Sequence, residues 1–256
     1  MKGRLFLVGL GLSKAFLTQV AIDALRLSDL VFFDVYTSLS CDLTPKTLSE
    51  LIGREVRAAN RDFLEAGSKV LLDMLEEGRT VSVATIGDPM IATTHVAVAV
   101  EAMKRGIEVK VIPGTSVFCY AISKSMLSSY KFGKSVTITY QGDRVDTTAL
   151  RVIEFNYSQG LHTLTFLDLK DGRPMSLEDA FRMLRLQEQE LGKSVLSQFE
   201  YVVVESRLGC SDESVKAISP NGPYDEAGAP PYVIIFPGRL HFMEVDALKC
   251  LRSKKG

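Results

Sequence analysis

The chain has 256 residues, 46% of them apolar, which is enough for one large packed domain or two small ones. Its 30 basic and 31 acidic side chains leave a formal net charge of −1, which excludes a global basic field for binding nucleic acid. No apolar run approaches the roughly 20 residues that a membrane-spanning helix needs. The apolar run near the N-terminus has no small-residue cleavage site after it. We therefore expect a cytoplasmic protein with no membrane or direct nucleic-acid partner.

The first half of the chain alternates strand patterns with helical patterns, which predicts a mostly parallel sheet covered on both faces. The helical pattern at 63–78 is amphipathic and ends in a glycine, a common helix stop. The predicted strands are 4–10, 30–36, 55–59, 80–87 and 108–114, and the predicted helices are 20–27, 48–52 (opened by Pro45), 63–78 and 95–106.

A short polar stretch around Gly133 interrupts this pattern, and the alternation then restarts. We predict an α/β fold with an N-terminal domain at 1–127 and a C-terminal domain at 135–256, joined by 128–134. The segment 207–229, rich in Gly, Ser, Pro and acids, is interpreted as a surface loop that could also help to dock a protein substrate. In this half the predicted strands are 135–140, 162–169, 201–206 and 230–238, and the predicted helices are 147–158, 176–191 and 242–252.

The four cysteines, Cys41, Cys119, Cys210 and Cys250, lie far apart and form no C-x-x-C pair. This spacing argues against zinc or redox chemistry, and we expect small apolar side chains in a reduced protein. The histidines also lack companions at metal-ligand spacing, so no metal site is predicted.

Two glycine motifs suggest nucleotide binding, but neither is complete. GLGLSK (9–14) lacks the third glycine of a dinucleotide fingerprint, so a plain tight turn is the better interpretation. Asp34, at the end of the second strand, lies where a ribose-binding acid would lie in such a fold. The Gly-Lys-Ser triplets at 133–135 and 192–194 lack the first P-loop glycine, five positions earlier, where Ser128 and Gln187 stand, which excludes that route to nucleotide hydrolysis.

The turns after the fourth and fifth strands carry polar groups at the sheet edge where open parallel sheets bind ligands. In GDPM (87–90), Asp88 can accept hydrogen bonds and Pro89 fixes a turn, although Asp88 could instead cap the next helix. In PGTS (113–116), Thr115 or Ser116 could likewise hold a ligand or cap a helix. No nucleophile motif is present, so an enzyme of this kind would work by positioning a reactive cofactor.

Several stretches, taken together, resemble one family. They are GLGL (9–12), YTSL (36–39), GDPMIATTH (87–95), YKFGKS (130–135), GLHTLTFLDLK (160–170) and PPYVIIFPGRLH (230–241). In order and over nearly the whole chain, they are similar to the diphthine synthase family of the tetrapyrrole-methylase-like (class III) superfamily. The resemblance implies two α/β domains with an S-adenosylmethionine site in the cleft between them.

The resemblance also implies the residues that contact the cofactor, many of them through backbone. They are Leu10, Asp88, Ile91, Ser116, Val117, Leu167, Leu208 and Tyr232. This sequence departs most from the family pattern at the last two. No catalytic residue is implied.

The implied substrate is translation elongation factor 2 bearing a 3-amino-3-carboxypropyl group on a histidine. The implied reaction methylates that amino group repeatedly, giving trimethylated diphthine and S-adenosylhomocysteine. A homodimer is implied as well. We hypothesise that Phe33, Tyr36 or Tyr140 contacts the growing ammonium through its ring, because each lies near a predicted strand end.

Two alternatives remain at this stage. One is another methyltransferase of the superfamily, acting on a corrin or porphyrin precursor or on ribosomal RNA, against which YTSL, YKFGKS and GLHTLTFLDLK argue. The other is a non-enzymatic ligand-binding α/β module, supported only by GLGL and Asp34.

Overall fold

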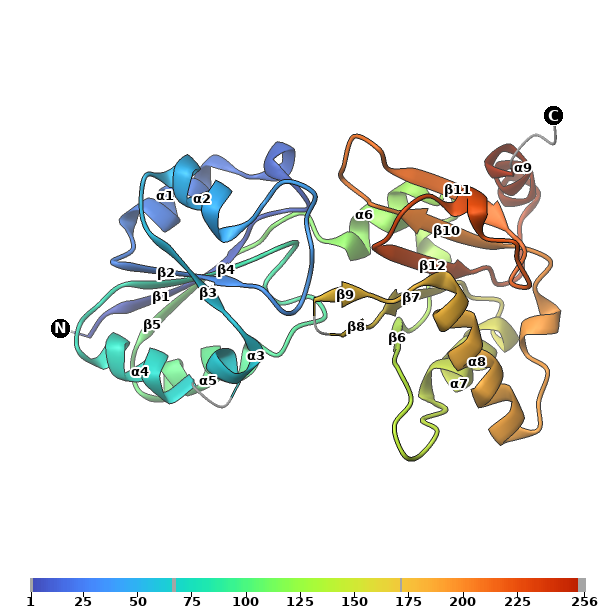
Figure 1. Cartoon of the computed structure of the whole chain (residues 1–256), viewed down its shortest axis with the longest axis horizontal. Helices are drawn as coiled ribbons and strands as arrows, with labels where there is room; N and C mark the ends of the chain where they lie inside the picture. The colour runs from blue at the N-terminus through green and yellow to red at the C-terminus, as the bar shows by residue number, and fades with distance from the viewer. Residues whose placement is uncertain (1, 66–67, 171, 253–256) are drawn as a thin grey trace. The chain divides into compact units, whose positions relative to one another are not determined.

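A computed structural model describes residues 2–65, 68–170 and 172–252. By its internal contacts the chain divides into two compact units, Met1–Val117 and Phe118–Gly256 (Figure 1). Both units are α/β, as predicted. None of the helices in the described part of the chain combines the length and the apolar character that a membrane crossing requires.

Unit 1 is built on a five-stranded parallel sheet in the order β3-β2-β4-β1-β5. Its strands are β1 (Arg4–Gly9), β2 (Leu30–Asp34), β3 (Val56–Ala59), β4 (Val81–Thr85) and β5 (Glu108–Ile112). Its helices are α1 (Gln19–Leu27), α2 (Pro45–Ile52), α3 (Arg61–Leu64), α4 (Ser68–Glu76) and α5 (Val96–Lys104), with a 3₁₀ turn η1 (Lys14–Phe16).

Two apolar clusters bury the two faces of this sheet. One joins the strands to α1 and α2, and the other joins them to α3, α4 and α5 (Figure 1). Every residue of β4 is buried, as expected for a central parallel strand covered on both sides. Covering both faces leaves the strand ends as the place where polar residues can gather.

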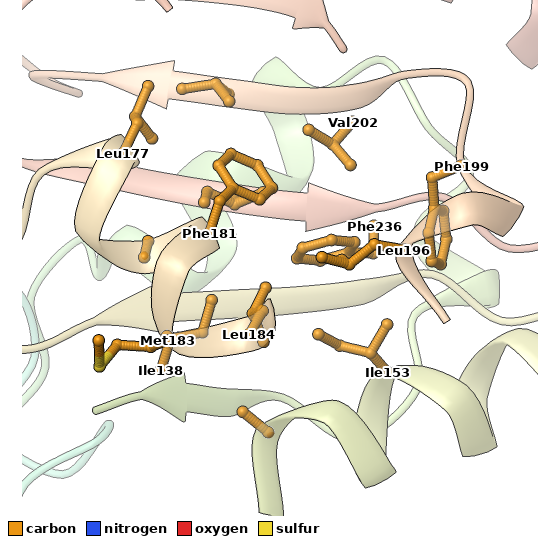
Figure 2. Packing of buried hydrophobic residues seen from close by; sticks show 14 of the residues in the cluster. Ile138, Ile153, Leu177, Phe181, Met183, Leu184, Leu196, Phe199, Val202 and Phe236 are labelled. Atoms are coloured by element: carbon orange, nitrogen blue, oxygen red, sulfur yellow. The ribbon is translucent and has the colours of Figure 1, made fainter. Parts of the chain in front are cut away.

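Unit 2 has a mostly antiparallel sheet in the order β11-β10-β12-β7-β6, in which only β6 and β7 run parallel. Helices α7 and α8 pack on a core that includes Phe181, Leu184 and Phe236 (Figure 2). The strands are β6 (Val136–Ile138), β7 (Thr163–Leu167), β10 (Val202–Ser206), β11 (Ser214–Ile218) and β12 (Tyr232–Phe236), with a hairpin of β8 (Leu169–Lys170) and β9 (Arg173–Pro174). The helices are α6 (Val117–Lys124), α7 (Thr148–Ser158), α8 (Leu177–Leu191) and α9 (Phe242–Leu251), with 3₁₀ turns η2 (Ser129–Lys131), η3 (Leu196–Gln198) and η4 (Asp225–Ala227).

Several parts of the structure differ from the prediction, including α6 and β9, which lie outside the predicted elements. The segment 207–229 is not a plain loop, because it contains β11 and η4. The pattern at 63–78 forms α3 and α4 instead of one helix, and residues 66–67 between them lie outside the described residues. The chain divides after Val117, whereas the predicted connection is 128–134, because α6 and η2 bond to unit 2.

The four cysteines also differ from the expectation of small apolar core residues. Cys41, Cys119 and Cys250 have exposed side chains and Cys210 is half-buried, so none of them fills the core. Among the described residues, no group of three or more His, Cys, Asp or Glu side chains could hold a metal ion.

A buried carboxylate fastens η2 to the start of α9. Glu244 accepts hydrogen bonds from the backbone N–H groups of Ser128 (2.9 Å) and His241 (2.7 Å), and it pairs with the Lys131 ammonium. Its Oε1 also lies 2.9 Å from Nε2 of His162. The motifs YKFGKS, GLHTL and PGRLH therefore meet at one side chain.

The same contacts define the state of the His162 ring. Its Nδ1 accepts a hydrogen bond from Gly238 N–H at 2.9 Å, so the ring proton is on Nε2 and is donated to Glu244. Burial lowers the pKa of His162 and keeps the ring neutral, although the Glu244 carboxylate acts to raise that pKa.

We expect Glu244→Gln to lower the free energy of unfolding by about 3 kcal/mol near neutral pH, because it leaves Lys131 without its buried partner. Burial would raise the pKa of Glu244, but its hydrogen bonds and Lys131 outweigh that effect and lower the pKa from 4.5 to about 2. Because this pKa is lower in the folded state, ionised Glu244 contributes fully to the free energy of unfolding above pH 4.5. That contribution is lost as the pH falls towards 2.

The difference in the free energy of unfolding between wild type and Glu244→Gln should therefore become smaller as the pH is lowered over this range. Denaturant unfolding measured at several pH values checks this, with the exposed Glu226→Gln as the matched control. A difference that stays constant down to the lowest pH would contradict the assignment.

Candidate functional site

Three turns of unit 1 meet at the carboxyl edge of the sheet, because β4, β1 and β5 are neighbours. Their backbones touch. A Cβ at Gly9 would lie 2.4 Å from the Gly114 nitrogen, and a Cβ at Gly114 would lie 2.2 Å from the Gly87 oxygen. Real Cβ atoms do not approach backbone so closely, so these positions require glycine. The edge is thus lined by backbone polar groups that a ligand can reach closely.

Hydrogen bonds extend the β1–β4 pairing into these turns. Leu10 N–H donates to the Thr85 carbonyl at 2.9 Å. Gly11 and Gly87 then exchange two bonds, of 3.1 and 2.8 Å, and form an antiparallel bridge. Gly87 has φ 80°, a left-handed conformation that suits glycine, so the chain reverses there at no side-chain cost. The turn that follows β4 is therefore held in place from its first residue.

The Asp88 carboxylate joins the GDPM turn to the PGTS turn. Oδ1 accepts a hydrogen bond from Met90 N–H at 2.8 Å, and Oδ2 accepts one from Gly114 N–H at 3.2 Å. It does not cap the next helix, because α5 begins only at Val96. Each carboxylate oxygen has two lone pairs, so Asp88 can still accept hydrogen bonds from a ligand.

One buried hydroxyl lies next to this edge. Thr85, the last residue of β4, is fully buried, and its Oγ1 has no hydrogen-bond partner among the described residues. Buried hydroxyls are normally hydrogen-bonded, so a polar ligand or a water molecule at this position would supply the partner that Thr85 Oγ1 lacks. The edge therefore fits a small polar ligand.

The residues after Asp88 explain why two threonines precede His95. The Pro89 carbonyl accepts hydrogen bonds from Thr93 Oγ1 at 2.5 Å and from His95 Nδ1 at 3.0 Å. The Thr94 hydroxyl lies 3.2 Å from the Tyr36 hydroxyl. The Thr-Thr-His segment thus holds the turn and links it to YTSL.

Asp34 is the buried anchor of that link. Its Oδ1 accepts from the N–H groups of Tyr36 (3.0 Å) and Thr37 (3.1 Å), and its Oδ2 accepts from the Thr37 hydroxyl (2.6 Å). Burial would raise the pKa of Asp34, but the nearby His95 ring and the hydrogen bonds from Thr37 and the Tyr36 N–H outweigh burial and lower the pKa. Asp34 is fully buried, so the interpretation of it as a ribose-binding acid is wrong.

The five predicted cofactor contacts of unit 1 all lie along this edge, but they differ in exposure. The Leu10 side chain is fully buried in the core, so only its backbone can contact a ligand. Ile91 is 42% exposed. Ser116 is buried, and Val117 begins α6 directly after it.

The three predicted contacts of unit 2 also lie together. Leu167 ends β7, Tyr232 begins β12, and Leu208 follows β10, all at the same edge of that sheet. Arg207 N–H donates to the Pro231 carbonyl at 2.9 Å, which holds Leu208 near Tyr232. The Tyr232 hydroxyl donates to the Gly228 carbonyl at 2.6 Å.

Of the three aromatic residues suggested to contact an ammonium, only Tyr36 keeps a suitable environment. Phe33 is buried in the core, which contradicts that role. Tyr140 already has the Lys170 ammonium 5.8 Å from its ring centroid, and its hydroxyl donates to Asp179. Tyr36 is half-buried beside Thr94. The structural roles of Thr85, Thr93 and Thr94 were not predicted, although the run of polar residues at a strand end was a signal for them.

Comparisons with known proteins agree with this geometry. Residues 4–217 match the family model of the tetrapyrrole (corrin/porphyrin) methylases. The chain is 48% identical over 250 residues to a diphthine synthase from Metallosphaera sedula, covering 96% of this chain and 98% of that protein. It is 50% identical over 258 residues to a diphthine synthase from Saccharolobus solfataricus, covering 97% and 99%. A crystal structure of diphthine synthase superposes with a TM-score of 0.87 at 30% identity, covering 98% of this chain and 96% of that one.

We expect Gly114→Ala to lower the free energy of unfolding by about 2 kcal/mol, because its Cβ would overlap the Gly87 carbonyl and push the turns apart. Gly142→Ala is the matched control, since a Cβ there meets no atom within 4 Å. Thermal and denaturant unfolding of the two variants checks the difference. Equal stability of the two would show that the turns are not packed backbone to backbone.

Proposed function

The chain belongs to the diphthine synthase family and is an S-adenosylmethionine-dependent methyltransferase of diphthamide biosynthesis, and we propose that it methylates translation elongation factor 2. The acceptor is the amino group of a 3-amino-3-carboxypropyl histidine. Repeated transfer gives the trimethylated product, diphthine. The observation that carries the proposal is the preorganised Gly-Asp-Pro edge in a chain that matches diphthine synthases over nearly its full length.

S-adenosylmethionine supplies a methyl group on a sulfonium, which the acceptor nitrogen attacks in line. In unit 1, Asp88 provides carboxylate lone pairs, Leu10 provides backbone, and Ile91 an exposed apolar side chain. Ser116 and Val117 complete this set of contacts. Leu167, Leu208 and Tyr232 form the set of unit 2. That both sets bind the same cofactor molecule stays a prediction of the resemblance.

The main task of the protein in this reaction is to position the methyl donor and the acceptor. The acceptor must lose a proton before it attacks, and an α-amino group has a pKa near ~8, so water can take that proton at neutral pH. The rate then depends on how well the turns hold the reacting atoms in line. Asp88 helps to hold these turns by joining two of them through hydrogen bonds, and the close glycine contacts limit how far the turns can move apart.

We also propose that the protein is a homodimer and is located in the cytoplasm. A homodimer follows from the resemblance to the family, and a cytoplasmic location follows from a substrate that works in translation. The corrin, porphyrin and ribosomal RNA alternatives lose support because the relatives at 48% and 50% identity are diphthine synthases.

Asp88→Ala should weaken S-adenosylmethionine binding by about tenfold or more, because it removes a charged acceptor and releases the Met90 and Gly114 N–H groups. Calorimetry measures the affinity, and the exposed Asp143→Ala serves as the control of equal charge change. An unchanged affinity for Asp88→Ala would remove this turn from the cofactor site.

The substrate is tested by mass spectrometry of elongation factor 2 that carries the aminocarboxypropyl histidine, after incubation with the protein and S-adenosylmethionine. We expect a gain of three methyl masses on that histidine. A smaller gain would keep the substrate and revise the product. No gain, with cofactor binding intact, would contradict elongation factor 2 as the substrate.

A further inference from the structure

His95 lies buried between two oxygen acceptors. Its side chain is 1% exposed. Nδ1 is 3.0 Å from the Pro89 carbonyl oxygen, and Nε2 is 3.3 Å from Oδ2 of Asp34. The second contact is at ion-pair distance without the alignment of a hydrogen bond, and Nε2 has no other partner among the described residues. Both ring nitrogens therefore face oxygen atoms.

These two contacts decide where the ring protons are. A carbonyl oxygen can only accept, so Nδ1 must carry a proton. Asp34 accepts hydrogen bonds from the Tyr36 N–H, the Thr37 N–H and the Thr37 hydroxyl, which favour its ionised form, and an ionised carboxylate too can only accept. A bare Nε2 would place its lone pair against those of Asp34 in a buried site, which is costly. Only the doubly protonated ring makes both contacts favourable, as a hydrogen bond to the Pro89 carbonyl and an ion pair with Asp34.

His162 shows the opposite arrangement in the same chain. Its Nδ1 accepts from the Gly238 N–H and its Nε2 donates to Glu244, so one proton satisfies the ring. The two buried histidines thus differ in what faces Nδ1, a carbonyl in one case and an N–H in the other. The contrast makes His162 an internal reference for His95.

We propose that His95 is a positioning residue for the Gly-Asp-Pro turn and acts as an imidazolium, clamped between the Asp34 carboxylate and the Pro89 carbonyl. It ties the end of β2 to the residue after Asp88, and so holds the turn that contains Asp88 and Ile91. This inference rests on the proposed function, in which that turn binds S-adenosylmethionine. Loss of one proton from His95 should therefore weaken cofactor binding.

Other ionisable groups lie on the segments around His95. From the segment after β2, the Tyr36 phenol has a pKa raised mainly by burial. After α3, the pKa of Glu65 is lowered by its bond from Arg61, so this pair stays ionised. Asp88 accepts two backbone N–H bonds on the turn itself. On α5, Glu101 pairs with Arg105 and Lys104 is exposed, at the far end from His95.

The first test is nitrogen NMR of the three imidazole rings in the wild-type protein, assigned with His241→Gln and His162→Gln. We expect both nitrogens of His95 to be protonated near neutral pH, while His162 shows one protonated and one bare nitrogen. A bare Nε2 on His95 at that pH would overturn the proposal. This measurement needs no ligand, and the charge of His95 is determined in the wild-type protein.

The second test uses Asp34→Asn, whose amide matches every contact with a neutral His95. The amide oxygen would accept from Tyr36 and Thr37 N–H. The amide NH₂ would donate one hydrogen to a bare Nε2 and the other to the Thr37 hydroxyl oxygen, which reverses that bond. Wild-type affinity for S-adenosylmethionine should fall by about tenfold when the pH is raised until the His95 ring is neutral. Asp34→Asn should bind the cofactor with an affinity that does not change over the same rise in pH.

Each result points to a different conclusion. A wild-type affinity that does not depend on pH would overturn the positioning role, as would an Asp34→Asn protein that keeps the wild-type pH dependence. A wild-type protein that binds no S-adenosylmethionine at any pH would overturn the proposed function and the positioning role with it. The NMR result on the charge of His95 would still hold in that case.

Discussion

The contact between three backbone turns is the constraint on which the rest of the site depends. There is no space for a Cβ at Gly9 or Gly114, so the ends of β1, β4 and β5 approach closely enough for Asp88 to accept from Gly114 N–H. One carboxylate then determines the geometry of two turns. A site built in this way is rigid before any ligand arrives, which suits an enzyme that works by positioning.

The sequence motifs occur together because their residues touch. Within unit 1, YTSL and the Thr-Thr-His segment meet through Tyr36, Thr94 and the Asp34–His95 pair. Within unit 2, Lys131, His162 and the chain before α9 converge on Glu244. Each unit therefore has its own buried polar cluster, and each cluster fixes a loop next to a strand end.

Local patterns in the sequence were sufficient for most of the regular elements. The strands of unit 1 and helices α7, α8 and α9 follow from apolar periodicity, because each buries one continuous face. β11 was missed because its five residues lie within a segment rich in Gly, Ser and Pro, and because a strand of that length becomes stable only by pairing with β10. Pairing between distant segments is not visible in local composition.

The chemistry of single side chains could be predicted less well. Asp88 stood out at a strand end, but its bond to Gly114 joins residues 26 positions apart. Asp34 resembled a ligand-binding acid until its burial became visible. Glu205 lies in a strand that was predicted correctly. Burial nevertheless raises its pKa to about 9, and neither of its oxygens has a partner among the described residues. Such states depend on packing, which sequence alone does not show.

A crystal structure of the protein with S-adenosylhomocysteine would show whether the Gly-Asp-Pro edge binds the cofactor. We expect the ligand to contact the Asp88 turn and the Leu10 backbone, with the glycine contacts unchanged. A ligand bound elsewhere, with Asp88 bonded only to Met90 and Gly114, would contradict it.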